Sequence, residues 1–383
     1  MTPLDEYRSL SRDVAAMPFM EWASRFSATA RDRDPWRDGS FRLHPAGCDW
    51  DLYGLVDMLL CAVTLEPSHP AIGRMDTGAW VERILSCLDT DGMATRRNPT
   101  DHVPEHATAY AYTGLVLLRN RGARVVPPPL RYFASPTFSR AEFEAWFRRM
   151  GLQCPRWFPG EGLRGSVRRS ARRLGWYRFW SGSHVGGGVM ATLVMRSQLS
   201  DPEGRLPRVD KVPELVAFFD LANHALESRT GLWRPWIKRI LSRRPDISDV
   251  GGAAHFLWLY DRLGVRHPRA EAMLAGALEL QRDDGLFSNE PGCLDLDFAH
   301  LFSYAARLGV REDLHHVDDA MLRNGIAVLG RLLGRGGLEG YVESHRLPGA
   351  LCAVAQVDAY LRWRGLESGP SPTRDVLSEV CWI

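Results

Sequence analysis

The hydrophobic positions along the chain fall into two alternating kinds of segment. One kind is apolar on nearly all sides, as buried helices are. The other repeats its apolar residues with a period of about 3.6, which is typical of a helix with one face in solvent. No run of alternating β-branched residues occurs, so the pattern predicts an all-α fold. The apolar segments are 50–65, 107–118, 185–195, 253–263, 298–308 and 348–363, and the amphipathic segments are 78–88, 140–150, 212–228, 268–281 and 317–333.

Glycine turns separate the two kinds of segment at similar places in each unit. Examples are LDTDGM (88–93), ESRTGLW (227–233), QRDDGLF (281–287) and LGRGGLEGY (333–341). Glycine supplies the positive φ that ends a helix. Repeats of this length indicate stacked or circular helical arrays, and about six inner and six outer helices would close as an (α/α)6 toroid. An open solenoid is the alternative, but the end units carry no polar cap of the kind that solenoids need.

The predicted organisation has one main domain with additions. Residues 1–40 are expected to form N-terminal helices, at 4–14 and 19–31, that pack on the ring, and residues 41–370 are the toroid. Segment 123–182 departs from the repeat and is rich in Pro, Arg and Trp, so we interpret it as an insertion or lid over one mouth. Residues 371–383 form a C-terminal tail.

Composition narrows the functional classes. With 45% hydrophobic residues among 383, the chain can bury a sizeable core. The chain has no apolar run of about 18 residues, so no transmembrane helix is predicted. No secretory signal is visible at the start. Seven cysteines without a CxxC pair indicate reduced thiols in a cytoplasmic protein. A net charge of +2 does not mark a nucleic-acid binder.

Three stretches resemble repeats of the terpenoid cyclase and protein prenyltransferase α/α-toroid superfamily. They are QRDDGLF with CLDLDFAHLFSYA, LDTDGM with HATAYAYTGLVLL, and ESHRLPGALCAVAQV. In that superfamily an Asp-Gly turn precedes an inner helix that opens on Asp or His. The resemblance covers about residues 45 to 365 and implies a toroid that acts on a small hydrophobic substrate, such as a prenyl compound.

The family's catalytic motifs match only in part. Its class II cyclases protonate an alkene with the middle Asp of a DxDD run, and the nearest matches are Asp295-Leu-Asp297-Phe and Asp49-Trp-Asp51-Leu, which lack the last Asp. Its prenyltransferases bind zinc through Asp, Cys and His. By resemblance those positions are Asp295, Asp297 and His345, with Asp297 in place of the cysteine. The resemblance thus raises zinc or another divalent metal as a cofactor.

In a closed toroid the starts of the inner helices surround one mouth. A carboxyl group partly buried there has a raised pKa and can donate a proton near neutral pH. Single residues also have ordinary explanations, because Asp caps helices and buried His forms hydrogen bonds in cores. A metal site made of Asp295 or Asp297 with His300 and His345 is a further reading. The candidates at the mouth are Asp49, Asp51, His106, His184, His255, Asp295, Asp297, His300 and His345.

Other side chains could bind a substrate. Aromatic faces stabilise a carbocation or stack on sugar rings, and the candidates are Trp50, Trp258, Tyr260, Phe298 and Phe302. Arginines in the insertion, Arg168 and Arg172 among them, could capture a phosphate or carboxylate. Three glycines at 186–188 allow either close helix packing or the approach of a ligand to the backbone.

Three functions remain open at this point. The first is a cyclase-like lyase or isomerase with Asp297 or Asp295 as general acid and a histidine as base. The second is a hydrolase or lyase acting on an acidic saccharide with the same residues. The third is a non-catalytic toroid scaffold. No GxxxxGK[ST], GxGxxG, HExxH or GxSxG sequence points to another enzyme class.

Overall fold

The computed structural model describes residues 2–28, 34–47, 49–66, 70–100, 102–132, 139–154, 175–310, 314–334, 337–368 and 371–383. Within these ranges the regular elements are helices, and the only β-type pairings are two isolated bridges. The predicted all-α class is therefore confirmed. None of the described helices has both the length and the hydrophobicity that a membrane span requires.

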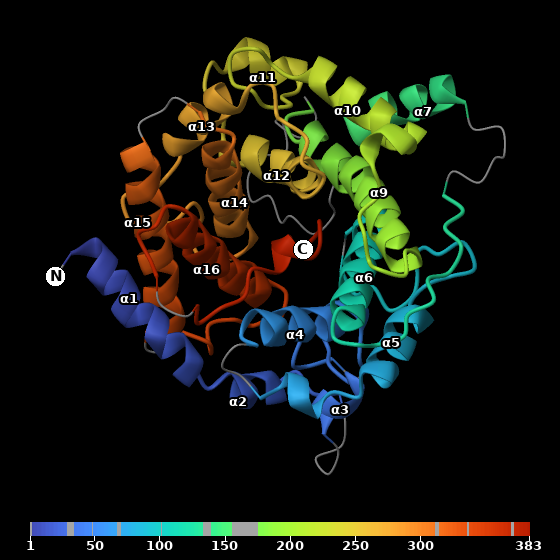
Figure 1. The fold of residues 1–383 in the computed structure, drawn as a ribbon, viewed down its shortest axis with the longest axis vertical. Coiled ribbons are helices and arrows are strands. Elements are labelled where there is room, and N and C mark those ends of the chain that lie inside the picture. Colours follow the sequence, from blue (N-terminus) through green and yellow to red (C-terminus); the bar gives the residue numbers. More distant parts are fainter. Residues whose placement is uncertain are drawn as a thin grey trace.

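Six helices form an inner ring, in which each helix packs against the next and the last returns to the first (Figure 1). Each of them overlaps one of the predicted all-round apolar segments, which explains why they occupy the middle of the molecule. In α4, for example, every residue is buried. The members of the inner ring are α4 (Leu52–Thr64), α6 (Pro104–Arg119), α9 (Arg178–Ser200), α12 (Ile247–Arg262), α14 (Cys293–Arg307) and α16 (Arg346–Trp363).

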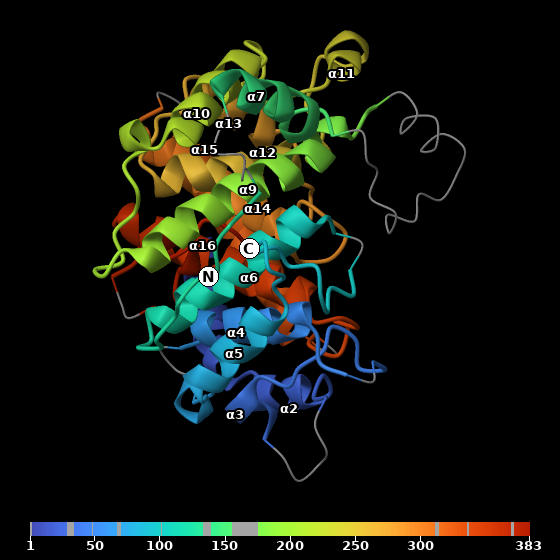
Figure 2. The same cartoon turned by 90° about the vertical axis from the view of Figure 1, so that its right-hand side faces the viewer.

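Amphipathic helices cover the inner ring from outside (Figures 1 and 2). They are α5 (Thr77–Ser86), α7 (Arg140–Trp146) with the π-helix Phe147–Gly151, α10 (Pro213–Ala225), α13 (Ala270–Leu278) and α15 (Leu314–Leu333). The N-terminal α1 (Pro3–Asp13) packs on α15. The remaining short helices are α2 (Phe19–Ser24), α3 (Pro35–Asp38) and α11 (Trp236–Leu241).

The glycines at 186–188 allow α9 to approach its neighbours closely. A Cβ on Gly188 would lie 2.7 Å from the carbonyl oxygen of Glu105 in α6. A Cβ on Gly187 would lie 2.9 Å from the carbonyl oxygen of His255 in α12. Real Cβ atoms do not approach backbone this closely, so close helix packing explains these glycines. It also fixes the separation of α6, α9 and α12, which carry the site described below.

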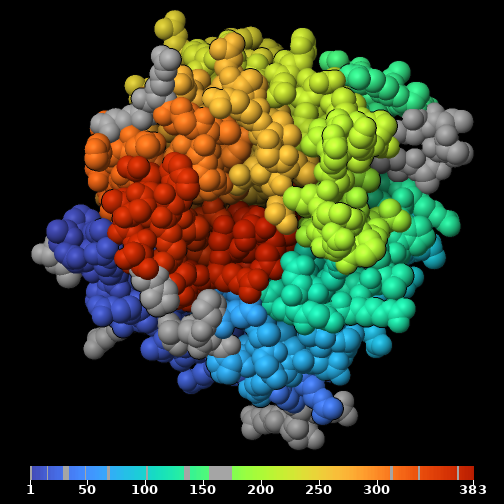
Figure 3. All heavy atoms as spheres, viewed as in Figure 1, coloured from blue at the N-terminus to red at the C-terminus, as the bar shows by residue number. Residues whose placement is uncertain are grey.

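The C-terminal segment lies inside the inner ring (Figure 1). In the space-filling view of the same face, atoms from the last part of the chain occupy the middle of the molecule (Figure 3). Trp382 is fully buried, and its carbonyl oxygen accepts a hydrogen bond of 2.7 Å from the Thr113 hydroxyl of α6. The segment predicted as a tail is thus part of the core.

Candidate functional site in the ring interior

Five histidines from four inner-ring helices or the residues before them meet in the ring interior. They are His102, His106, His184, His255 and His345, and we call them the histidine cluster. The ring centroids of His102 and His106 are 4.2 Å apart, those of His106 and His184 are 4.8 Å apart, and those of His184 and His255 are 4.1 Å apart. His345 lies 5.6 Å from His102. Four of the five were predicted, and His102 is the addition.

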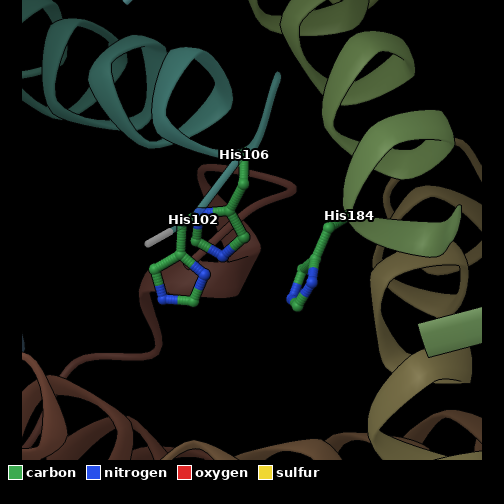
Figure 4. Close-up of side chains that lie close together, drawn as sticks. All are labelled: His102, His106 and His184. Carbon is green, nitrogen blue, oxygen red and sulfur yellow. The ribbon is translucent and has the colours of Figure 1, made fainter. Parts of the chain in front are cut away.

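Three members of the cluster converge more closely. His102 precedes α6, His106 lies in the first turn of α6, and His184 faces them from α9 (Figure 4). One ligand atom from each can be chosen so that all three lie within 4.8 Å of one another. We call these residues the histidine triad. Among the residues that the structure describes, it is the one convergent group of three metal-ligating side chains.

Hydroxyl groups orient two of the imidazoles. The Tyr53 hydroxyl lies 3.0 Å from His106 Nδ1, and the Ser183 hydroxyl lies 3.0 Å from His255 Nδ1. Ser183 donates its only proton to the carbonyl oxygen of Trp180, at 2.8 Å. It must therefore accept from His255 Nδ1–H, which leaves the lone pair on Nε2 of that ring.

Two tryptophans close one side of the cluster. The Trp382 ring lies 5.2 Å from His106 and 4.9 Å from His255, the latter in a stacked arrangement. Trp258 lies 5.3 Å from His255 and 5.6 Å from Trp382. Trp258, a predicted substrate-binding residue, is thus at the site. The position of Trp382 depends on the tertiary fold and could not be read from the sequence.

A buried carboxylate holds His345. Asp57, in the middle of α4, is fully buried. It accepts hydrogen bonds from the Ser344 hydroxyl at 2.5 Å and from the Tyr110 hydroxyl, and its Oδ1 lies 3.0 Å from His345 Nδ1. Among the described residues His345 is its only ion-pair partner. The carboxylate therefore fixes both the orientation of the His345 ring and the nitrogen that carries its proton.

Burial keeps the other imidazoles neutral. It is the main cause that lowers the pKa of His102 and of His255 to about 3, and neighbouring imidazoles add to the effect at His102. Burial, followed by the surrounding histidines, also holds the pKa of His106 and His184 well below the usual value. Neutral imidazoles are the form that accepts protons and binds metals.

Asp297 is a buried acid in the first part of α14. Burial, followed by the charge of Asp295, raises its pKa well above the usual value, which favours the protonated form of the carboxyl group. Its Oδ1 has no hydrogen-bond partner among the described residues. Its Oδ2 lies 3.5 Å from where a Cβ on Gly251 would be, one helical turn before His255 on α12. Asp297 thus combines a raised pKa with an oxygen that no described residue engages.

Cys293, at the start of α14, interacts electrostatically with both Asp297 and Asp57. Burial, then the charges of Asp297 and Asp57, raise the pKa of its thiol. The thiol in turn contributes to the raised pKa of Tyr53 and Tyr110, after burial and Asp57. The Cys293 thiol is therefore close enough to Asp297, Asp57 and the two tyrosines to interact electrostatically with all four.

Asp295 has a different place from Asp297. Its carboxylate accepts hydrogen bonds from the backbone N–H groups of Phe287 at 3.0 Å and Gly292 at 3.2 Å, and from Asn324 Nδ2 of α15 at 3.0 Å. It therefore ties the loop before α14 to the outer layer. Residues two apart on a helix point in different directions, so the two carboxyl groups of this pair have different surroundings.

His300 also lies away from the cluster. Its Nε2 is 3.6 Å from Asp261 Oδ2, near the end of α12, and its ring is stacked 6.4 Å from Tyr304. Burial lowers its pKa. It lies about two turns along α14 from the helix start, near the end of α12 that carries Asp261, and the expected convergence at one mouth does not include it.

The carboxylates before α4 serve the local fold. The side chain of Asp49 is 61% exposed and pairs with Arg97 at 2.6 Å. Asp51 is the N-cap of α4 and accepts from the N–H groups of Gly54 at 2.8 Å and Leu43 at 2.7 Å. Burial raises the pKa of Asp51 to about 6. Capping, the ordinary role of Asp at a helix start, accounts for Asp51.

Trp50, another predicted substrate contact, does not lie in the interior. Trp50 is half-buried between the guanidinium groups of Arg83 and Arg97, which lie 4.9 and 4.2 Å from its ring. Arg168 and Arg172 lie outside the described residues. Trp50 therefore takes part in a cation–π stack next to the exposed Asp49.

The other predicted aromatic residues pack toward the outer layer. The Tyr260 hydroxyl donates to Asn223 of α10 at 2.6 Å. Phe298 stacks on Phe287 with centroids 3.8 Å apart, and Phe302 meets the edge of Phe287 at 5.7 Å. The inward-facing residues described above are instead histidines, tyrosines and tryptophans. The sequence indicates which helices are apolar all round but not which apolar side chain faces inward.

The family-derived zinc positions do not fit a metal. Asp295 is committed to backbone amides, His345 is held by Asp57, and these two with Asp297 form no convergent group. A signal for the triad was nevertheless present, because His102 and His106 have the HxxxH spacing of paired zinc ligands. His106 immediately precedes the apolar segment 107–118 that predicted α6, whereas His102 lies further before it and was overlooked.

Comparison of the chain with models of protein families, with curated proteins and with solved structures finds no match.

Proposed function

We propose that the inner and outer helices form an (α/α)6 toroid and that its interior is the active site of a cyclase-like enzyme. The closed cycle of contacts among six inner helices supports the toroid. The Asp-Gly turns that precede inner helices support the relation to terpenoid cyclases. The fold alone would not indicate a reaction, so the proposal depends on the side chains of the interior.

Asp297 is the general acid in this proposal. The main support for this role is its raised pKa together with an oxygen that has no partner among the described residues. A carboxyl group whose pKa is raised by burial, with one oxygen that no described residue engages, is suited to donate a proton to a substrate. Asp295, by contrast, is fully occupied by hydrogen bonds. The acid of the Asp295/Asp297 pair is therefore Asp297.

His345 is the base that completes the cycle. When its Nδ1–H donates to Asp57, the lone pair of Nε2 is left to accept a proton from the substrate. The carboxylate stabilises the imidazolium that forms, as in other Asp–His pairs. Asp57 is a positioning residue, because it acts through His345.

The substrate is a small molecule with a large apolar part. Tyr53, Trp258 and Trp382 present aromatic rings around the histidine cluster, and such faces stabilise a carbocation that forms after protonation. A prenyl substrate fits this chemistry.

A saccharide is the second candidate, favoured by one observation. The interior presents the Tyr53 and Tyr110 hydroxyls and the imidazoles instead of the phenylalanines expected for an apolar bowl. Hydroxyl and imidazole groups match the hydrogen-bonding groups of a sugar. In that reaction Asp297 and His345 would keep the roles of acid and base.

The test is product formation by the full chain with prenyl diphosphates and, separately, with uronic-acid oligosaccharides, followed by mass spectrometry. Asp297→Asn is expected to lower turnover at least about 100-fold, the usual contribution of a general acid. Asp49→Asn is the matched control at an exposed site and is expected to keep full turnover. Full turnover by Asp297→Asn with either substrate class would contradict the proposal.

A further inference from the structure

We propose that the histidine triad, His102, His106 and His184, binds one zinc ion or a similar divalent transition-metal ion. This site is separate from Asp297 and His345, and it goes beyond the acid–base function proposed above. Neither the family-derived ligand set nor any single predicted residue leads to it. It follows from where α6 and α9 place three imidazoles.

The separation of the three rings suits a metal. Their ligand atoms lie within 4.8 Å of one another. Tetrahedral zinc with Zn–N bonds of about 2.0–2.1 Å places its ligand nitrogens about 3.3 Å apart. Side-chain rotations that close at most about 1.5 Å between nitrogens are therefore sufficient. Figure 4 shows His102 and His106 side by side, with His184 opposite them across the gap.

The backbone under each ligand is held in place. Before α6, the Asn98 side chain donates to the carbonyl oxygen of His102 at 3.2 Å, and the N–H of His102 donates to the Thr100 hydroxyl at 3.2 Å. Pro104 then begins the helix. In α9, the contact of Gly188 with the Glu105 backbone sets the distance between the two helices. A preformed arrangement of this kind lowers the ordering cost of metal binding.

The Tyr53 hydroxyl can hold the ring of His106 in the orientation that a metal ligand needs. Metal-binding histidines almost always donate their other ring N–H to an oxygen. When His106 Nδ1–H donates to Tyr53, at 3.0 Å, Nε2 is left with the lone pair that a metal needs. Tyr53 packs against Tyr110, with ring centroids 4.9 Å apart, so the hydroxyl is fixed.

The chemistry of the donors selects the class of metal. Imidazole nitrogens suit zinc, copper, nickel and iron, whereas magnesium and calcium prefer oxygen ligands. Glu105, between His102 and His106 in the sequence, accepts a hydrogen bond from Tyr132 at 2.8 Å and serves the packing of that segment on α6. The buried carboxylate of Asp57, reached through His345, supplies negative charge to the same interior. Three protein ligands leave a fourth position for water or a substrate atom, as in catalytic zinc sites.

The test is metal binding by the full chain, independent of any activity. Protein stripped with a chelator is titrated with Co²⁺, whose visible absorption reports tetrahedral coordination, and then with Zn²⁺ in competition. We expect one metal per chain. His106→Ala and His184→Ala should each weaken binding at least about 100-fold, and Tyr53→Phe about 10–100-fold, as outer-shell losses do.

His300→Asn is the matched control, because His300 is a buried inner-ring histidine outside the triad, and it should bind metal as the wild type does. Thermal unfolding of each variant establishes that it is folded, and Tyr53→Phe keeps the ligands intact if an alanine variant does not fold. A wild-type protein that takes up neither metal would overturn the proposal. Equal affinity in the wild type, Tyr53→Phe and a folded His184→Ala would also overturn it.

Discussion

Two clusters of buried polar side chains share helix α12 and are built in opposite ways. In the ion-pair cluster, made of Glu227, Arg234, Lys238, Asp246 and Asp249, every cation meets two carboxylates. Arg234 lies 3.0 Å from both Glu227 and Asp249, and Lys238 lies 2.7 Å from both Asp246 and Asp249. Its charges are satisfied within the protein, so stabilising α11 and the start of α12 explains its presence.

The histidine cluster lacks this local compensation. Four imidazoles are kept neutral by burial, and the only ion-pair partner of Asp57 among the described residues is His345. Nearby, Asp297 has an oxygen without a partner among the described residues. Buried polar groups normally find partners within the fold. The first cluster therefore finds its partners on folding, whereas we propose that the second is completed by a ligand.

The largest expected loss of stability comes from a substitution that breaks the ion-pair cluster. Arg234→Ala leaves Glu227 and Asp249 buried with one cation fewer, which should lower the free energy of unfolding by about 3–5 kcal/mol. Urea unfolding followed by circular dichroism measures it. Arg244→Ala is the control, because that side chain is 82% exposed and its pairing with Glu279 should contribute less than about 1 kcal/mol. Equal losses in both variants would show that the cluster is not structural.

The next largest effect is a difference in stability between variants of the two α14 carboxyl groups, Asp295 and Asp297. Asp295→Asn removes an acceptor that faces two backbone N–H groups and Asn324, so unfolding free energy should fall by about 1–3 kcal/mol. Asp297→Asn should cost less than about 1 kcal/mol, since Oδ1 has no partner to lose. Urea unfolding of both variants at one pH measures the contrast. A larger loss at Asp297 would assign the structural role to that residue instead.

Asp297 and Glu227, one buried carboxyl group from each half of this comparison, should respond to pH in opposite directions. Burial raises the pKa of Asp297, so its contribution to stability is present at low pH and is lost as pH rises through the folded-state pKa. Burial alone would also raise the pKa of Glu227, but Thr230 and Arg234 outweigh it and the pKa is lowered. That contribution is present at neutral pH and is lost on acidification.

Unfolding free energies of the wild type, Asp297→Asn and Glu227→Gln across acidic to alkaline pH test these directions. Relative to the wild type, Asp297→Asn should gain as pH rises and Glu227→Gln should gain as pH falls. Parallel pH profiles for the wild type and Asp297→Asn would contradict the assignment of a protonated Asp297.

The smallest effect is expected outside both clusters. Asp49→Asn breaks an exposed pair with Arg97, and exposed pairs contribute from almost nothing to about 1 kcal/mol. Urea unfolding at low and high salt measures it, and the difference should shrink at high salt because exposed charges are screened. A loss above about 2 kcal/mol would mean that the segment before α4 has a structural role not evident from its contacts.

The sequence was informative about helices because burial on all sides leaves a pattern. The segments predicted at 50–65 and 253–263 contain most of α4 and much of α12. The meeting of His106, His184, His255 and His345 was anticipated because inner helices of a ring begin at one mouth. Asp57 was missed because it looks like an isolated polar residue inside a uniformly apolar helix, and its partners Tyr110 and Ser344 are distant in sequence.

Other failures have an equally physical cause. Asp51 and Asp295 satisfy the same sequence pattern as Asp297, since acidic residues at helix starts cap helices as often as they face a cavity. The inward or outward direction of Phe298 and Tyr260 depends on helix rotation, which a uniformly apolar segment does not specify. The position of Trp382 depends on the path of the last residues into the ring, which no local pattern encodes.

The central claim is that the histidine cluster, and not the ion-pair cluster, is completed by a ligand. The direct measurement is the change in unfolding free energy when Zn²⁺ is added to chelator-stripped wild type, His184→Ala and Glu227→Gln. At a zinc concentration of about 100 Kd, the account predicts stabilisation of about 2.7 kcal/mol in the wild type and in Glu227→Gln, and none in His184→Ala. No stabilisation of the wild type, or the same stabilisation in all three proteins, would contradict it.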